Sequence, residues 1–471
     1  MVKEKIKDIY IDDDIYPRIN KSNKTIEAYI ESLKAGAKFP PIEVQKINNE
    51  GTEQIILLDG LHRLEAYKES KIDEIDVIFW KEDILNKKEY LNDLRLRAAN
   101  LNIQHGDRLS HEDMKQTSRK IATDDPEKKY TEQKIADQLG IPQQTVHDWI
   151  ADIRANQTAS RNNIIYRLAF LGWTQDEIAE KTGLTSRTIR EIGSNTEIGK
   201  ISAFINDQLK KGNTIEQAAG KLEIDHTLAW TIHLKDKTDD KRLEELKIEP
   251  KKFTSWNFTG CNPLMGRDTF NGRIPGEFPL NFIYRFTKPG DLVIDPMAGG
   301  GITLDACLLL NRKCRSYDIE PIRDEIEKHD ITKGYPELKK KPNAIFCDPP
   351  YWSCIDYNEG LSSYSLIEYY DAISKFIKDT YDVLQNDGIF GIMMSNQSTR
   401  IPIEKGKLTQ EYGHRLEHII TVYNMCLDVK FKPEWRIICP LSNQNAQDWA
   451  RGEWELGRLG ELNRELLIFR K

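Results

Sequence analysis

Three short apolar segments, each ending in an aspartate, constrain the fold of this chain more than any other feature. They end at Asp295, Asp318 and Asp348, and a glycine-rich turn that includes Gly299 to Gly301 follows the first. Short apolar runs are typical of buried strands, and the helical spacing of Ile302 to Leu310 adds a helix after the turn. The carboxyl ends of parallel strands meet at one edge, where ligands bind. We therefore expect an open, doubly wound sheet with three acids at that edge.

The glycine turn is suited to holding a nucleotide-like cofactor. Glycines let the backbone approach a ligand closely, and the start of the following helix presents free amides to polar atoms. Asp318 follows Asp295 by 23 residues and can accept hydrogen bonds from a ribose. The spacing is not G-x-G-x-x-G, so the turn alone does not identify the cofactor.

The segment Asp348-Pro349-Pro350-Tyr351-Trp352 is suited to chemistry on the exocyclic amine of a flat ring. Asp348 and the Pro349 carbonyl can accept the two amine hydrogens while Tyr351 stacks on the ring. Accepting these hydrogens draws the nitrogen towards tetrahedral geometry, which favours its attack on an electrophile. The alternative is a stiff loop after a strand.

The motifs DPMAGGG, YDIEP and DPPYW together resemble those of the amino-methylating DNA methyltransferases, which use S-adenosylmethionine to methylate adenine N6 or cytosine N4. The resemblance implies that Asp348, Pro349, Pro350 and Tyr351 hold a flipped base. It implies a cofactor site formed by Asp295, Pro296, Met297, Ala298, Gly299, Gly301, Asp318 and Ile319, with Asp318 on the ribose. Phe278-Pro279 resembles the family's additional cofactor motif, and Met297 departs from the phenylalanine that the family usually has.

Other chemistries fit the sequence less well. Methylation at cytosine carbon 5 needs a cysteine nucleophile, usually in a Pro-Cys pair, and the chain contains no such pair. All seven cysteines lie after residue 260 without a C-x-x-C pair, so we expect neither a metal site nor a disulfide framework. No run approaches 18 apolar residues, so we expect a cytoplasmic protein without membrane contact. The net charge of -7 means that a DNA-binding surface must be local.

The N-terminal region predicts a small α+β unit. A helical pattern from Ile26 to Leu33 precedes strand patterns at Ile42 to Val44 and Gln54 to Leu58, and a polar turn with Gly60, His62 and Arg63 then opens a helix. Such a turn is suited to binding phosphate. The alternative is that Arg63 only bridges local structure. The strand with its LLDGLHRLEA box resembles the ParB-like N-terminal domain, whose corresponding box binds nucleotide phosphates, and CTP binding is left open.

An internal repeat follows, in which Thr131, Thr174 and Thr214 each open the pattern T-x-x-x-[IA]-A. Its spacing predicts two short helices around a tight turn, hence three helix-turn-helix units. In the first two units the residues that begin the second helix are expected to meet DNA. These are Gln143, Gln144, Thr145 and His147, and Ser186, Arg187 and Arg190. The third unit has Glu223 in place of the turn glycine and is expected to be structural; a helical packing module is the alternative for the whole array.

We therefore predict a ParB-like α+β domain at 1–100, an all-α helix-turn-helix array at 101–250 and a Rossmann-like methyltransferase domain at 251–471. A charged stretch at about 235–252 is expected to form a solvated linker. The predicted activity is methylation of a base amine in double-stranded DNA. Adenine is favoured because the family's adenine members more often carry Asp at the position of Asp348. Cytosine N4 methylation, RNA guanine methylation and a ParB-like clamp with a relic methyltransferase domain are the alternatives; a homodimer and a restriction nuclease partner are left open.

Overall fold

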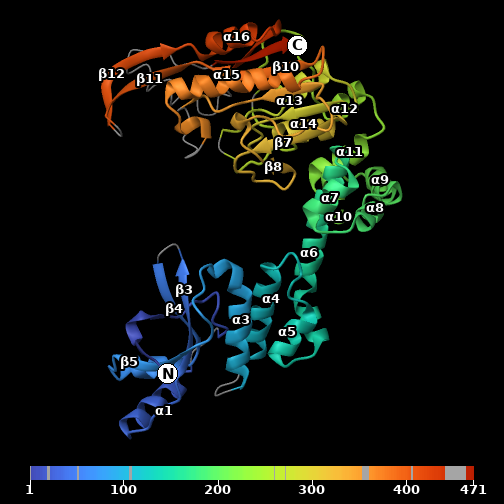
Figure 1. Cartoon of the computed structure of the whole chain (residues 1–471). Coiled ribbons are helices and arrows are strands. Elements are labelled where there is room, and N and C mark those ends of the chain that lie inside the picture. The colour runs from blue at the N-terminus through green and yellow to red at the C-terminus, as the bar shows by residue number, and fades with distance from the viewer. Residues whose placement is uncertain are drawn as a thin grey trace. The chain divides into compact units, whose positions relative to one another are not determined.

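The computed structural model describes residues 2–18, 22–49, 52–104, 109–258, 260–270, 272–352, 360–404, 407–440 and 463–471. The chain forms two compact units, Met1–Thr158 and Ala159–Lys471 (Figure 1). Helix α6 (Gln143–Phe170) contains residues of both. These units differ from the three predicted ranges, because the second and third helix-turn-helix units belong to the same compact unit as the sheet that carries Asp295 and Asp318.

The first unit contains a five-stranded sheet in the order β1-β5-β3-β4-β2. Its strands are β1 (Val2–Lys5), β2 (Ile9–Tyr10), β3 (Ile42–Asn49), β4 (Thr52–Asp59) and β5 (Glu74–Phe79). Its further helices are α1 (Asn23–Lys34), α2 (Leu61–Glu69), α3 (Lys87–Gln104), α4 (His111–Thr123) and α5 (Glu132–Leu139). Alternate residues of β4 enter different cores, Leu57 in one cluster and Ile56 with Leu58 in another, so both faces of the sheet are covered. The predicted α+β architecture is confirmed.

The second unit is built on a seven-stranded sheet in the order β13-β14-β10-β9-β6-β7-β8. Its strands are β6 (Leu292–Asp295), β7 (Lys313–Asp318), β8 (Ile326–Lys328), β9 (Ala344–Cys347), β10 (Ile389–Ser395), β13 (Lys432–Pro440) and β14 (Asn463–Arg470). Only β14 runs antiparallel to its neighbours β10 and β13, while the described pairings among β6 to β10 are parallel. The doubly wound sheet is as predicted.

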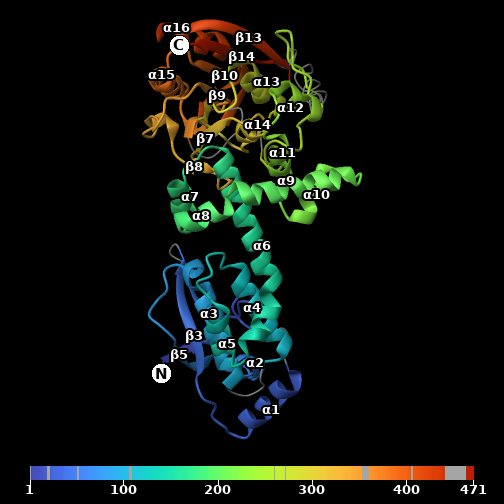
Figure 2. The ribbon, with the colours of Figure 1, turned by 90° about the vertical axis from the view of Figure 1, so that its right-hand side faces the viewer.

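Helices cover both faces of this sheet, as Figure 2 shows for α15 on one side and α13 and α14 on the other. The helices are α13 (Glu277–Phe286), α14 (Ile302–Leu309), α15 (Leu366–Val383) and α16 (His418–Asp428). Val293 of β6 joins the core under α13 and α14, whereas its neighbour Ile294 joins the core under α15 and α16. A hairpin of β11 (Gln397–Glu404) and β12 (Lys407–Leu416) follows β10.

The three repeats form three helix-turn-helix units, as the threonine spacing predicts. Thr131, Thr174 and Thr214 are the N-caps of the first helices, and each side chain accepts a hydrogen bond from the backbone amide three residues on. The helix pairs are α5 with α6, α7 (Gln175–Thr182) with α8 (Ser186–Ile192), and α10 (Ile215–Leu222) with α11 (His226–Leu234); α9 (Asn195–Lys210) precedes the third pair. Residues of the second helix-turn-helix unit, α7 and α8, belong to the hydrophobic core beneath α13 and α14.

The third repeat is a packing element. Its second helix, α11, packs against α14 and has six of its nine residues buried. This burial accords with the structural role considered for the third repeat. The turn residue Glu223 has φ 53°, where Gly140 and Gly183 have 64° and 67°, so a non-glycine residue occupies the left-handed conformation.

The charged stretch at 235–252 is not simply solvated. It contains helix α12 (Asp239–Glu245), in which Arg242 and Leu243 are buried. Asp239 accepts hydrogen bonds from the guanidinium of fully buried Arg312 at 2.7 and 2.8 Å. The alternating charges suggested a solvated face because the pattern does not reveal a distant partner such as Arg312.

Replacing Glu223 with glycine should stabilise the protein. Glu223 is exposed and its side chain has no described hydrogen bond, so Glu223→Gly removes backbone strain without removing a contact. Relief of the strain stabilises the folded state, while the greater freedom of glycine in the unfolded chain opposes this effect. The net gain in the free energy of unfolding should be about 0.5 to 1 kcal/mol. It would appear as a higher thermal unfolding midpoint. Gly183→Ala, which introduces the same kind of strain, should lower the midpoint; equal midpoints for both variants would contradict this account.

Candidate active site

The three predicted acids meet at one edge of the second sheet. Strands β9, β6 and β7 are neighbours and run parallel. Asp295 and Asp318 are the last residues of β6 and β7, and Asp348 directly follows β9. Parallel strands place their carboxyl ends side by side, so three acids distant in sequence share this edge, as predicted.

The turn after β6 brings backbone amides to these acids. The amide of Gly299 donates to Asp318 Oδ2 at 2.8 Å. Gly299 and Gly301 have φ of 46° and 80°. A Cβ at Gly299 would lie 2.7 Å from the ring of Phe270, and one at Gly301 would lie 2.7 Å from the guanidinium of Arg323. Conformation and space therefore both require glycine at these two positions.

Asp295 is buried beneath the turn. It is 4% exposed, and its Oδ1 accepts the amide of Met297 at 3.2 Å. The pKa of Asp295 is raised to about 7, chiefly by burial and further by the charges of Asp318 and Asp348. Hydrogen bonds from Thr303 and Met297 act in the opposite direction. This carboxyl therefore changes its charge near neutral pH.

The segment after β9 is held by hydrogen bonds. The hydroxyl of Tyr351 donates to Asp348 Oδ1 at 2.5 Å, and the hydroxyl of Tyr369 donates to the Pro350 carbonyl at 3.0 Å. Trp352 has φ 47°, an uncommon value for a bulky residue, and its indole donates to the Tyr364 carbonyl at 2.9 Å. Such a strained position persists only where its surroundings fix it. The segment is therefore a fixed part of the site.

The remaining residues of the predicted cofactor site occupy two environments. Met297 and Ile319 are partly exposed. Pro296, Ala298, Phe278 and Pro279 are buried, the last two in the first turn of α13, where Phe278 packs edge-on against Phe258 at 5.0 Å. Direct contact of these residues with a cofactor stays a prediction.

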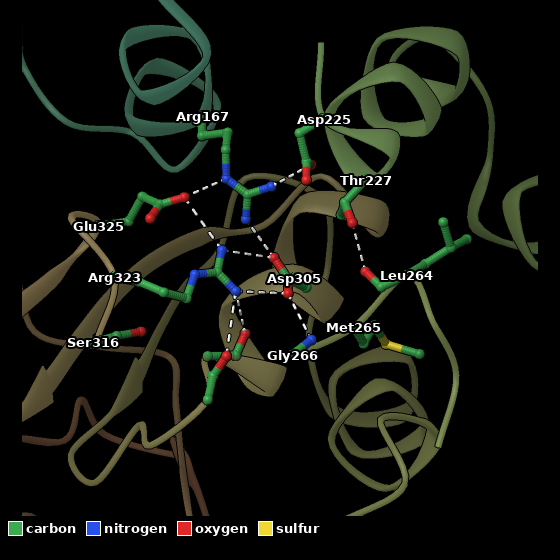
Figure 3. A network of polar contacts seen from close by, with 12 residues as sticks. Arg167, Asp225, Thr227, Leu264, Met265, Gly266, Asp305, Ser316, Arg323 and Glu325 are labelled. Atoms are coloured by element: carbon green, nitrogen blue, oxygen red, sulfur yellow. Dashed lines mark hydrogen bonds and ion pairs between the residues drawn. The ribbon is translucent and has the colours of Figure 1, made fainter. Parts of the chain in front are cut away.

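A buried ionic network lies behind the glycine turn and was not predicted (Figure 3). Arg167 of α6 pairs with Asp305 of α14 and with Glu325, and it donates to Asp225 at 2.6 Å. Arg323 donates to both carboxylate oxygens of Asp305, at 2.8 and 3.0 Å. Arg323 also approaches the carbonyls of Gly300 and Gly301 at 3.4 and 3.5 Å. Opposite charges compensate one another here, which burial requires.

This network joins the second and third helix-turn-helix units to the glycine turn within the second compact unit. Asp225 is the N-cap of α11 and accepts the amide of Leu228 at 2.9 Å. Thr227 of the same helix donates to the Leu264 carbonyl. Two residues further along the chain, the backbone amide of Gly266 donates to Asp305 at 2.8 Å. The sequence carried one signal of this arrangement, a lone acid in the apolar helix Ile302–Leu309.

The predicted nucleotide box of the first unit is occupied by local contacts. Gly60, with φ 102°, precedes α2, and a Cβ there would collide with Ile42. Arg63 donates to Asp59 at 2.6 Å and to the carbonyls of Pro40 and Pro41 at 2.7 and 2.9 Å. Buried His62 accepts the amide of Ser22 at 3.1 Å. Arg63 thus forms the local bridge considered as the alternative, and nucleotide binding stays a prediction.

The predicted DNA-reading residues lie at the starts of α6 and α8. Gln143, Gln144, His147, Arg187 and Arg190 are exposed, while Thr145 and Ser186 are partly exposed. Several contact acids of their own unit: His147 lies 3.0 Å from Glu132, and Arg187 lies 3.0 Å from Glu191. Exposed pairs of this kind are weak, so these side chains can exchange partners.

Among the described residues, no group of three or more His, Cys, Asp and Glu side chains could hold a metal ion. No helix in the part of the chain that the structure describes is long and apolar enough to span a membrane.

Removing the central arginine of the network should destabilise the protein strongly. Arg167→Met leaves Asp305 and Glu325 buried with fewer compensating charges, at a cost of about 3 to 5 kcal/mol. Arg187→Met is the matched control: Arg187 is 87% exposed in its pair with Glu191, so the change should cost within about 0.5 kcal/mol. Urea unfolding of both variants measures the difference. Similar losses would show that burial of the network contributes nothing.

Comparison with known proteins connects this edge to a family. A family model described as DNA methylase matches residues 196–328, from α9 to the end of β8. The match includes the glycine turn and Asp318 and ends 20 residues before Asp348. No curated protein matches the chain.

Similar solved structures include TrmN from Thermus thermophilus (13% identity, TM-score 0.26, 42% of this chain and 48% of that one). ParB from Caulobacter crescentus bound to the centromeric parS site has 15% identity and a TM-score of 0.22, over 47% of this chain and 99% of that one. Phosphoethanolamine N-methyltransferase 2 from Haemonchus contortus has 14% identity and a TM-score of 0.27, over 42% and 53%. Values this low establish no function, and the chain spans about half the length of TrmN. The family match carries more weight, and by it residues 196–328, with the glycine turn and Asp318, are similar to the DNA methylases.

Proposed function

We propose that this protein transfers a methyl group from S-adenosylmethionine to the exocyclic amine of a base in double-stranded DNA, adenine N6 in preference to cytosine N4. The observation that carries the proposal is the pair of Asp348 and Tyr351, both partly buried and hydrogen-bonded at 2.5 Å directly after β9, the strand next to β6 and its glycine turn. The DNA methylase match over 196–328 supports the cofactor half of the site.

The residues around the turn fit S-adenosylmethionine. Gly299 and Gly301 have positive φ, and a Cβ at either would overlap Phe270 or Arg323, so glycine keeps the tight turn whose backbone a cofactor would approach. Asp318 is partly exposed and retains lone pairs for ribose hydroxyls beside the bond from Gly299. Asp295 lies below the turn, where a carboxylate would favour a cationic amino group. When bound, the cofactor supplies an electrophilic methyl group on a sulfonium.

The segment after β9 would hold the base. A nucleotide rotated out of the duplex can present its amine to Asp348 and to the Pro349 carbonyl, with Tyr351 against its ring. The hydrogen bond between Tyr369 and the Pro350 carbonyl fixes the direction of this segment, so the acceptors are positioned before the base arrives. Positioning of this kind supplies much of the catalysis in a reaction that needs no protein nucleophile.

The second helix-turn-helix unit would hold the DNA close to this pocket. Its helix α8 carries exposed Arg187 and Arg190, and its core is continuous with the core of the catalytic sheet. Arginine can contact phosphates and guanine edges in the major groove. The first repeat would add Gln143, Gln144 and His147.

Asp348→Asn should abolish methyl transfer while leaving cofactor binding intact. The amide oxygen of asparagine accepts the amine hydrogens more weakly than a carboxylate does, because it lacks the negative charge, so we expect a loss of at least about 100-fold in kcat. Tritiated S-adenosylmethionine, unmethylated duplex DNA and nucleoside analysis give both the rate and the base. Label in methyladenosine confirms adenine, and label in methylcytidine indicates cytosine N4. Label only in tRNA, or a fully active variant, would refute the proposal.

Removing both arginines of α8 should weaken DNA binding at every sequence. Arg187→Ala with Arg190→Ala removes two phosphate-facing charges, so the slope of log K against log salt should fall by about 2. His226→Ala, at the equivalent start of α11, is the control and should leave the slope unchanged. Fluorescence anisotropy over a salt series measures both. An unchanged slope in the double variant would place the DNA elsewhere.

A further inference from the structure

Arg464 occupies the same edge of the sheet as the three acids. Strand β14 runs antiparallel to β10 and β13, so it begins where they end, and Arg464 pairs in register with Ser395 and Cys439. The motifs gave no sign of it, since Arg464 lies 116 residues after Asp348. Only the strand reversal brings this cation to the active edge.

The guanidinium of Arg464 faces the catalytic pair. Its central carbon lies 6.0 Å from the centroid of the Tyr351 ring, within the range of a cation–π interaction. The hydroxyl of the same tyrosine donates to Asp348. Arg464, Tyr351 and Asp348 therefore form one cluster whose formal charges sum to zero when the carboxyl is ionised.

The cluster places a positive charge near a carboxyl whose ionisation burial opposes. Burial raises the pKa of Asp348 above its usual range, and the charge of Arg464 and the hydrogen bond from Tyr351 lower it. Three further groups interact electrostatically with Asp348: Asp295 of β6, Cys347, which precedes it on β9, and Cys439 of β13. Burial raises the pKa of both thiols, so they stay neutral, and Asp295 can only oppose ionisation. Arg464 is the one cation that acts on Asp348 among the described residues.

We propose that Arg464 is a positioning residue for methyl transfer, which keeps Asp348 as a carboxylate that accepts hydrogens from the base amine and holds the ring of Tyr351 in place. The inference rests on the proposed function. A protonated Asp348 would present its own O–H to an amine that also donates, so the charge of this carboxyl decides whether the base is held.

The test compares Arg464→Met, Arg464→Lys and, as control, Arg436→Met. Arg436 lies on the adjacent strand β13, is half exposed and pairs with Glu465. Without Arg464 the pKa of Asp348 rises further, so activity should be lost on the acid side and recovered as the pH rises. At the pH where the wild type is half active, kcat of Arg464→Met should fall about fivefold or more, since a nearby opposite charge shifts a carboxyl by about 1 to 3 units.

Arg464→Lys should lie between the two profiles, and Arg436→Met should follow the wild type. Affinity for S-adenosylmethionine, measured by equilibrium binding, should be the same in all four proteins. A parallel loss of kcat at every pH would show a structural role and overturn the inference. An unchanged profile would overturn it as well.

A double-mutant cycle tests the inference even if the wild type methylates no DNA. At pH 8, Arg464→Met should destabilise the protein in urea when Asp348 is present and much less in the D348N background, because the interaction depends on the carboxylate charge. Equal costs in both backgrounds would overturn the inference. Absence of methyl transfer by the wild type, in contrast, would count against the proposed function alone.

Discussion

Parallel pairing of β9, β6 and β7 is the constraint on which the site depends. Parallel strands need crossover connections, and these leave the carboxyl ends of all three strands at one edge. That placement has an electrostatic cost, because the charges of Asp318 and Asp348 add to burial in raising the pKa of Asp295. The backbone amide of Gly299 on Asp318 and the hydroxyl of Tyr351 on Asp348 offset part of this repulsion. The fold thus brings together three carboxylates that are distant in the sequence.

The ionic network behind the turn shows how the helix-turn-helix part and the catalytic sheet become one unit. Arg167 and Arg323 carry two positive charges, and Asp225, Asp305 and Glu325 carry three negative ones, in a region where four of these five side chains are about 5 to 6% exposed. Buried ion pairs add little net stability when compared with apolar packing. Removing one partner is nevertheless strongly destabilising, because it leaves an uncompensated charge in the interior. They therefore fix geometry. Arg323, which touches Asp305 and approaches two glycine carbonyls, extends that fixed geometry to the cofactor turn.

The three repeats share their local signals and differ in what surrounds them. Each begins with a threonine N-cap, and each has a left-handed residue in its turn. The helix that would read DNA is exposed at α8 and buried against α14 at α11. Packing therefore decides which repeat can contact nucleic acid, since capping and turn chemistry are the same in each.

The sequence by itself determined the elements and the active edge. Short apolar runs ending in Asp295, Asp318 and Asp348 were enough to place three acids together, because parallel strands have only one way to align their ends. The repeats were predictable from local signals, because each carries a threonine cap and a turn residue at the same spacing. The partners of buried charges were not: Arg167 with Asp305, Asp239 with Arg312, and Arg464 near Tyr351 are contacts between residues 73 to 138 positions apart. No pattern of period 2 or 3.6 encodes such pairs. Tertiary packing decides them, because a charge removed from water must find its counterion wherever the fold provides one.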